Sequence, residues 1–157
     1  MLCNKEEVQG TPLFPRDLMR WSADFYAPVF EAVGAMPPFG LVEHDYCLGK
    51  RKCGGNAQTI SRGRWVHHTS FLWDFSTANM ALLRLPDKRP TYRGDRGHDD
   101  FLARLSSSLA VTEADAFLGA VEERLRDLFD VRDAGLDEAM AVLQSTTERQ
   151  TNKVVAY

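Results

Sequence analysis

The chain has 157 residues, 44% of them hydrophobic and 26% charged, which is enough for one globular domain with a buried core. No apolar run approaches the ~20 residues that cross a bilayer, so the composition predicts no association with a membrane. The first residues combine early acids with no apolar core, which predicts neither a secretory signal nor a transit peptide. Three cysteines without CxxC spacing predict reduced thiols and an intracellular protein.

The middle of the chain is cationic. Residues 50–98 carry ten lysines and arginines against three acids, whereas both flanks carry more acids than bases. Such a block attracts phosphate, carboxylate, nucleic acid or an acidic protein. Because the flanks are acidic and few aromatic residues interleave with the bases, the sequence predicts no nucleic-acid binding.

The first predicted elements are an irregular segment over residues 1–15 and a helix. Apolar residues recur at helical spacing from Arg16 to about Val33. Pro28 is expected to kink or split this helix, and Gly34 is expected to end it.

Three strands are predicted next. Residues 41–48 and 51–60 form a hairpin around Gly49-Lys50, because glycine in the first central position fits a type II′ turn. Aromatic and β-branched residues predict a further strand over residues 64–75.

Helices dominate the second half. The patterns predict a short helix capped by Ser76, a loop over 84–98, a short helix to Leu105, a helix after a capping box at 112–115, a helix over 136–143 and a frayed tail from Gln144. Since strands precede most helices, the fold class is α+β with an antiparallel meander, and residues 1–157 form a single domain.

The hairpin carries most of the chemistry. If Gly49-Lys50 is a two-residue turn, position 47 pairs with 52 and position 45 with 54, so that Asp45, Cys47, Lys52 and Gly54 share one face of the sheet. An acid and a lysine would then lie together beside strand backbone.

Gly54-Gly55 is unusual inside a strand, because glycine packs no side chain and loses the most entropy on folding. The pair predicts either a bulge or the close approach of a ligand to the backbone. Asn56 would offer amide hydrogen bonds at the edge of that space. The plainer alternative is a simple bulge beside a lysine that faces water.

The paired histidines argue against a metal centre. His67 and His68 point to opposite faces of a strand, so they cannot both bind one metal ion. No third ligand stands at metal-like spacing, and the sequence predicts no metal site formed by these residues. GxxxxGK[ST], GxSxG and GxGxxG motifs are absent.

Two segments resemble a known family. The run from Asp45 to Gln58, with Trp65-Val66-His67-His68-Thr69-Ser70-Phe71-Leu72 behind it, is similar to the catalytic domain of lipoate–protein ligases. The later Tyr92-Arg93, Arg96, His98 and Asp100-Phe101-Leu102 resemble the plant-type branch of that family. The similarity covers roughly residues 8–130. It implies an antiparallel or mixed sheet with flanking helices, as in biotin–protein ligases and class II aminoacyl-tRNA synthetases.

The resemblance also implies an activity. Such ligases use ATP and Mg²⁺ to convert lipoate into lipoyl-AMP, and then pass the lipoyl group to a lysine of an acceptor domain. The acceptors would be lipoyl domains of 2-oxoacid dehydrogenases or the glycine cleavage H protein, in the cytoplasm or mitochondria.

The family's functional residues match particular positions here. Lys52 corresponds to the catalytic lysine that contacts the ligand carboxyl and the α-phosphate. Asp45 corresponds to an aspartate near the nucleotide and metal, and His68 to a histidine near the acyl group. The backbone that approaches the acyl-adenylate would come from Gly54, Gly55, Asn56 and Ala57.

The sequence also departs from the family. His44 replaces an asparagine, Thr69 a glycine and Thr59 an arginine, and the triple-glycine loop of the ligases is absent. We therefore expect an N-terminally incomplete catalytic domain with impaired activity. Two alternatives stay open: an octanoyltransferase with Cys53 as nucleophile, and a non-catalytic module that binds an acyl group or an acceptor domain.

Overall fold

The computed structural model describes residues 1–4 and 14–145 of the chain. At its centre lies an antiparallel sheet with the spatial order β1-β5-β4-β3-β2. The strands are β1 (Leu2–Asn4), β2 (Phe39–Val42), β3 (Asp45–Leu48), β4 (Arg51–Ile60) and β5 (Arg64–Phe71). Strands β2 to β5 follow one another through short turns, so they form a meander. The predicted α+β class is confirmed.

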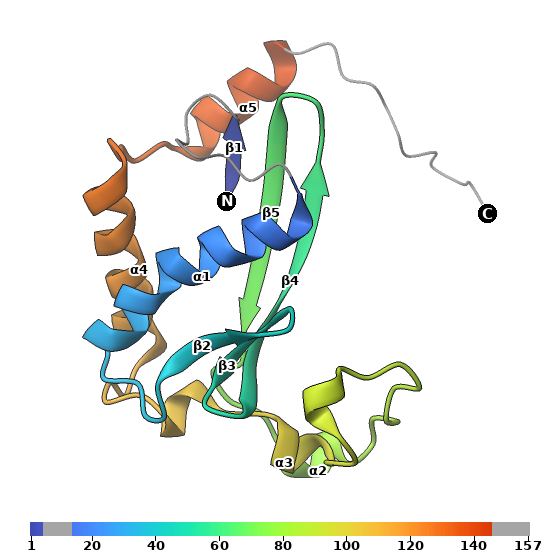
Figure 1. Cartoon of the computed structure of the whole chain (residues 1–157). Helices are drawn as coiled ribbons and strands as arrows, with labels where there is room; N and C mark the ends of the chain where they lie inside the picture. Colours follow the sequence, from blue (N-terminus) through green and yellow to red (C-terminus); the bar gives the residue numbers. More distant parts are fainter. Residues whose placement is uncertain (5–13, 146–157) are drawn as a thin grey trace, which may run out of the picture.

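Helix α1 (Pro15–Ala32) covers one face of the sheet (Figure 1). Its aromatic side chains pack on those of the strands, with ring centroids 5.6 Å apart for Tyr26 and Tyr46 and 4.2 Å apart for Phe30 and Phe39. The predicted helix is confirmed. It ends at Ala32, and Gly34 just beyond it has a φ of +66°, in the left-handed region that glycine adopts most readily.

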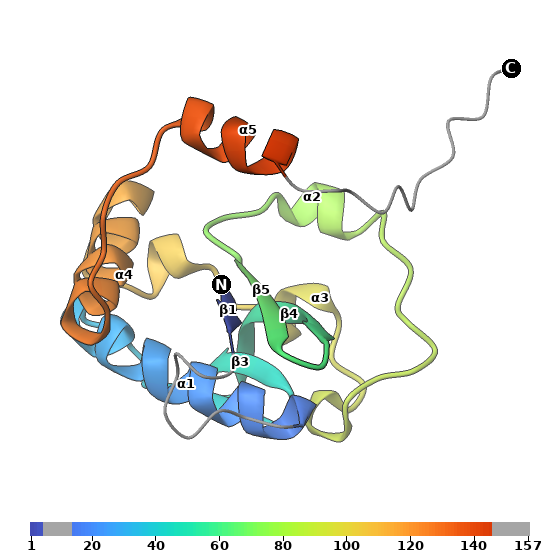
Figure 2. The same ribbon diagram turned by 90° about the horizontal axis from the view of Figure 1, so that it is seen from above.

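The remaining helices are α2 (Thr77–Met80), α3 (His98–Phe101), α4 (Ala114–Leu128) and α5 (Leu136–Ser145), with 3-10 turns η1 (Thr91–Arg93) and η2 (Leu105–Ser107). Helix α4 packs on α1, whereas α2 and α3 lie on the side of the strands away from α1 (Figure 2). Ser76 caps α2 as predicted, since its hydroxyl accepts a hydrogen bond from the Asn79 backbone N–H. Among the helices of the described segments, none has both the length and the apolar character needed to span a membrane.

The predicted single strand over 41–48 is wrong. The chain forms two strands there, and it turns between them at Glu43-His44, so that Val42 pairs with Asp45. Glu43 adopts a φ of 54° in this turn. Because glutamate has no preference for that conformation, no residue marked the turn in the sequence.

Three other boundaries differ from the predictions. Residues 2–4 are a strand rather than irregular, because they pair with β5. The strand predicted over 64–75 ends at Phe71, and one further bond in the same register follows, from the Leu72 N–H to the Cys53 carbonyl. The capping box does not form, since Glu113 is the N-cap residue of α4 and makes no side-chain cap.

Near each end of the chain, only some of the residues are described by the structure. Helix α5 includes Gln144 and Ser145, so the predicted tail does not start at Gln144. The irregular segment predicted over residues 5–13 and the tail predicted over 146–157 lie outside the described residues.

Polar side chains link α1 to two strands inside the core. The Tyr46 hydroxyl of β3 lies 2.6 Å from the Ser22 hydroxyl of α1 and 2.8 Å from Nε2 of His67 on β5. All three side chains are buried, with at most 1% of each residue exposed. This network connects α1 to the face of the sheet that it covers. Lys52 and Asp45 lie on the opposite face.

Candidate functional site

The candidate site lies on the face of the sheet away from α1 and centres on an ion pair. Nζ of Lys52 on β4 lies 2.6 Å from Oδ1 of Asp45 on β3. The two side chains are 29% and 15% exposed, so the pair is half-buried but still reached by solvent. An ammonium group in this position can meet a ligand without first leaving a closed core.

A β-bulge decides which residues share this face. The turn at Gly49-Lys50 has two residues, and Cys47 pairs with Lys52 as predicted. The next pair, however, is Tyr46 with Gly54, so Cys53 is an extra residue on β4. The predicted pairing of Asp45 with Gly54 is therefore wrong. Lys52 stays beside Asp45, while Gly54 turns toward the core.

The two glycines have different surroundings. A Cβ on Gly54 would lie 2.6 Å from the Phe71 ring and 2.9 Å from the Ser70 carbonyl oxygen, so this glycine is required by packing inside the protein. A Cβ on Gly55 would lie 3.7 Å from both Cε and Nζ of Lys52. Gly55 is therefore the position where bare strand backbone lies directly under the ammonium group.

Asn56, Ala57 and His68 continue along the strands. Ala57 pairs with His68, and both residues are exposed. Alternation along β4 places them on the same face as Gly55. The Asn56 amide instead donates to the His44 carbonyl at 3.0 Å, which ties β4 to the turn between β2 and β3. Asn56 thus supports the position of the residue that precedes Asp45.

The paired histidines separate as predicted. His67 is buried against Tyr46, and His68 is exposed on the other face. Burial lowers the pKa of His67 to about 4, and the charges of the N-terminal ammonium and His68 act in the same direction. Because its ring is neutral at physiological pH, His67 has a structural role.

The two central cysteines are buried free thiols. The Cys53 thiol donates to the Tyr46 carbonyl at 3.3 Å, and burial raises its pKa far above the ordinary value. The Cys47 thiol donates to the Tyr92 hydroxyl at 3.4 Å, and burial raises its pKa as well. Neither thiol is an activated nucleophile, since a thiolate requires a lowered pKa and access.

Tyr92 belongs to the site although the sequence reasoning did not assign it a role. Its hydroxyl donates to Oδ2 of Asp45 at 2.9 Å, so both oxygens of this carboxylate have partners. Burial, the hydrogen bonds to Cys47 and Asp45, and the negative charge of Asp45 raise the pKa of Tyr92, which keeps its proton on the phenol. The only sequence signal was its place in the Tyr92-Arg93 motif.

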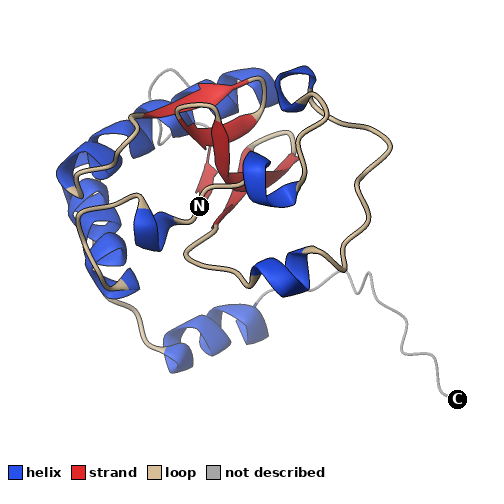
Figure 3. Ribbon diagram, turned by 90° about the horizontal axis from the view of Figure 1, so that it is seen from below, coloured by secondary structure: helices blue, strands red, loops and turns tan. Residues whose placement is uncertain are grey.

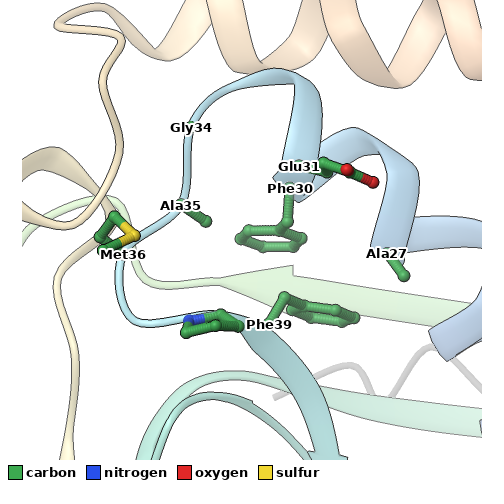
Figure 4. Close-up of a pocket in the computed structure, with 8 residues that line it drawn as sticks. Ala27, Phe30, Glu31, Gly34, Ala35, Met36 and Phe39 are labelled. Carbon is green, nitrogen blue, oxygen red and sulfur yellow. The ribbon is translucent and has the colours of Figure 1, made fainter.

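A cavity lies away from this ion pair. It has a volume of about 450 Å³ and opens at the C-terminal end of α1, where Phe30 and Phe39 line it (Figure 4). A second hollow of about 340 Å³ is lined by residues that include Arg16, Arg20 and His44. Of these, His44 directly precedes Asp45 in the sequence. Over residues 1–4 and 14–145, no three histidine, cysteine or acidic side chains gather to hold a metal ion.

Comparison with known proteins identifies the family. Residues 10–126 match the family model of the lipoyl protein ligase A/B catalytic domain. A curated relative from Plasmodium falciparum, inactive lipoate–protein ligase 2, is 42% identical over 69 residues, which are 43% of this chain and 18% of the relative. The chain thus spans less than a fifth of that protein.

A solved structure shows the same fold. The chain matches a T. acidophilum protein, described as a candidate lipoate protein ligase and solved with bound lipoic acid, at a TM-score of 0.65. The sequence identity is 12%, and the match covers 91% of this chain and 56% of that protein. Together, the family match, the fold and the motif around Lys52 show that this chain belongs to the lipoyl protein ligase A/B catalytic domain family.

Proposed function

We propose that this chain provides the lysine-bearing side of a site that activates lipoate with ATP to lipoyl-AMP. The lipoyl group would then pass to a lysine of an acceptor domain, in a 2-oxoacid dehydrogenase or a glycine cleavage H protein. The observation that carries the proposal is the placement of the Lys52 ammonium group over the backbone of Gly55. Membership in the ligase family supports the choice of lipoate and a protein acceptor.

The chemistry follows from the charge of Lys52. When a carboxylate attacks the α-phosphate of ATP, negative charge accumulates on the phosphoryl oxygens and on the departing pyrophosphate. A fixed ammonium group stabilises that charge more in the transition state than in the ground state. The same group would polarise the acyl carbonyl when the acceptor lysine attacks it. Gly55 leaves room for the acyl-adenylate to approach both the backbone and Nζ.

Asp45 has two tasks in this proposal. It holds Nζ of Lys52 at 2.6 Å. Mg²⁺ in nucleotide sites takes one or two carboxylates together with phosphate oxygens and water, and Asp45 would be the protein ligand nearest to the lysine. The metal would neutralise phosphate charge when bound. Both carboxylate oxygens of Asp45 already have protein partners, Lys52 and Tyr92. The metal ion would therefore have to share one oxygen with one of these partners.

A cysteine-dependent transferase is disfavoured. An octanoyltransferase of this fold would need Cys53 as its nucleophile. The thiol is fully buried, donates to a backbone carbonyl and has a raised pKa. A buried, protonated thiol cannot attack a carrier-bound acyl group.

A non-catalytic module is the second candidate. The curated relative with 42% identity is named an inactive ligase. In addition, Asp45 already balances the charge of Lys52, which leaves less of that charge to stabilise a transition state. Such a module would hold lipoate or an acceptor domain through the same face of the sheet.

Lipoate-dependent exchange of pyrophosphate into ATP tests the proposal. The wild-type chain should catalyse exchange, and Lys52→Ala should lower the rate by roughly 100-fold or more, as expected for removal of one transition-state contact. Lys88→Ala, in an exposed loop, is the matched control for loss of a lysine. Cys53→Ser should leave exchange unchanged.

Other results separate the alternatives. Loss of acyl transfer on Cys53→Ser, with none on Lys52→Ala, would establish the transferase instead. Saturable binding of lipoate without exchange would leave the module as the function of this chain. If neither exchange nor binding depended on Lys52, the proposed site would be wrong.

A further inference from the structure

Residues 91–103, which we call the strap, cross the end of the β3–β4 hairpin that carries Lys52. Figure 3 shows α3, which is part of the strap, lying beside the strands. The strap bonds to three successive residues of the hairpin. Arg96 donates to the Lys50 carbonyl at 2.8 Å, and the Ala103 N–H donates to the Lys52 carbonyl at 2.8 Å. Between them, Arg51 donates to the Asp99 carbonyl at 2.7 Å.

The strap is itself a well-fixed structure. Arg93 is 5% exposed and lies over the Phe101 ring, with its Cζ 4.5 Å from the ring centroid. Its Nε donates to the Arg96 carbonyl at 3.1 Å, and Nε of Arg96 donates back to the Arg93 carbonyl at 3.1 Å. Arg96 also donates to the Tyr92 carbonyl at 2.6 Å. These bonds use two arginines of the cationic block to fix the backbone that carries Tyr92.

Tyr92 connects the strap to the ion pair. Its backbone N–H donates to Oε1 of Glu43 at 3.1 Å, and its ring packs on Phe101 with centroids 5.3 Å apart. From this fixed position its hydroxyl donates to Oδ2 of Asp45 at 2.9 Å, while Oδ1 of Asp45 holds Lys52 at 2.6 Å. The contacts form one chain from the strap through Asp45 to the ammonium group.

We propose that Tyr92 is a positioning residue that acts through Asp45 to hold the Lys52 ammonium group over Gly55. The inference rests on the proposed adenylation, in which Lys52 must meet a developing charge. A lysine side chain has four rotatable bonds, and a carboxylate with one free oxygen can rotate away from it. A charge-assisted hydrogen bond from the half-buried Tyr92 phenol restricts that rotation. The amine is then in place before a ligand arrives, which is the condition for electrostatic stabilisation of a transition state.

The reactivity of the lysine itself provides a test that does not depend on catalysis. Trace acetylation with isotopically labelled acetic anhydride, read by mass spectrometry, compares Lys52 with the exposed Lys88 in the same molecule. Tyr92→Phe removes only the hydroxyl and should raise the relative acetylation of Lys52 about two- to five-fold, the range expected for loosening one half-buried ion pair. Asp45→Asn should raise it to a similar extent.

A double variant shows whether Tyr92 acts through Asp45. In the Asp45→Asn background, Tyr92→Phe should produce no further change, because its partner is already altered. Tyr46→Phe is the matched control: it removes a hydroxyl from β3 on the opposite face, so it should lower the unfolding temperature and leave Lys52 acetylation unchanged. In pyrophosphate exchange, Tyr92→Phe should lower kcat about tenfold with little change in KM for ATP.

The outcomes are distinguishable. Unchanged Lys52 acetylation in Tyr92→Phe would overturn the positioning role, whatever happens to exchange. Additive effects of Tyr92→Phe and Asp45→Asn would also overturn it, because they would show that Tyr92 does not act through Asp45. The wild-type chain could also fail to catalyse pyrophosphate exchange while Tyr92→Phe still raises the acetylation of Lys52. That result would support the positioning role and reject the proposed adenylation.

Discussion

At the scale of single residues, the site depends on which side of β4 each backbone position faces. Gly54 and Gly55 are adjacent and identical in sequence, yet the first packs on the Phe71 ring and the second lies under Lys52. Adjacent strand residues face opposite sides of a sheet, and the extra residue at Cys53 decides that Gly54 faces the core while Gly55 shares a face with Lys52. A pair of glycines therefore serves two purposes, internal packing and an open surface.

Alanine at each glycine should separate these purposes. Gly54→Ala forces a methyl group into the Phe71 ring and the Ser70 carbonyl, and we expect it to reduce the free energy of unfolding by about 1–3 kcal/mol. Gly55→Ala meets only ordinary contact distances and should change stability by less than about 1 kcal/mol. Urea denaturation of both variants checks the prediction, and equal losses would contradict the bulge register.

At the scale of elements, α1 shows how packing overrides a local signal. Pro28 lies inside the helix, removes one backbone hydrogen bond and places its ring near the Asp24 carbonyl. The helix still runs unbroken over Pro15–Ala32, because Phe25, Val29 and Phe30 are buried against the sheet. Both Asp24 and Pro28 lie on the exposed side, where water can bond to the freed carbonyl.

Replacing this proline should stabilise the chain. Pro28→Ala restores a donor for the Asp24 carbonyl, and we expect the free energy of unfolding to rise by about 1–3 kcal/mol. Pro28→Gly restores the same donor with a poorer helix former, so its gain should be about 1 kcal/mol smaller. Thermal unfolding followed by circular dichroism measures both. A lower melting temperature for Pro28→Ala would show that the ring stabilises the helix in another way.

At the scale of the whole molecule, the two faces of the sheet have separate roles. One face is covered by α1 and held by the Ser22, Tyr46 and His67 network, whereas the other presents Lys52 and Asp45 next to the strap. Helix α5 stands apart from the sheet in Figure 2, and Leu136 on it is 77% exposed. Stability and chemistry thus depend on opposite sides of β3, β4 and β5.

The buried face predicts a pH dependence of stability. The pKa of His67 is about 4 in the folded chain and 6.5 as an ordinary value, so between these values the unfolded chain binds a proton that the folded chain does not. The stabilisation is present above pH 6.5 and is lost as the pH falls toward 4. We expect a loss of about 2 kcal/mol between pH 7 and pH 5.

Urea denaturation of wild type and His67→Gln over this pH range isolates the contribution, because glutamine does not titrate. The variant should lose most of the slope between pH 7 and pH 5. The exposed His68→Gln should retain it. A wild-type slope that survives in His67→Gln would assign the pH dependence to other groups.

The sequence by itself determined the class of the fold, the helix before the sheet, the two-residue turn at Gly49-Lys50 and the motif that identified the family. Those features are local: they depend on periodicity, on turn chemistry and on residues close together in the chain. It also placed Lys52 beside Asp45, since that pairing follows from the length of one turn.

Only the tertiary structure decided the rest. The bulge at Cys53 and the turn at Glu43-His44 lie between neighbouring strands, but no residue type marks either one, and the packing of the sheet on α1 decides both. The pairing of residues 2–4 with β5 joins segments more than 60 residues apart. Tyr92 reaches Asp45 across 47 positions of sequence. No periodicity reports such a contact, because the chain brings these atoms together only after the strap has packed against the hairpin.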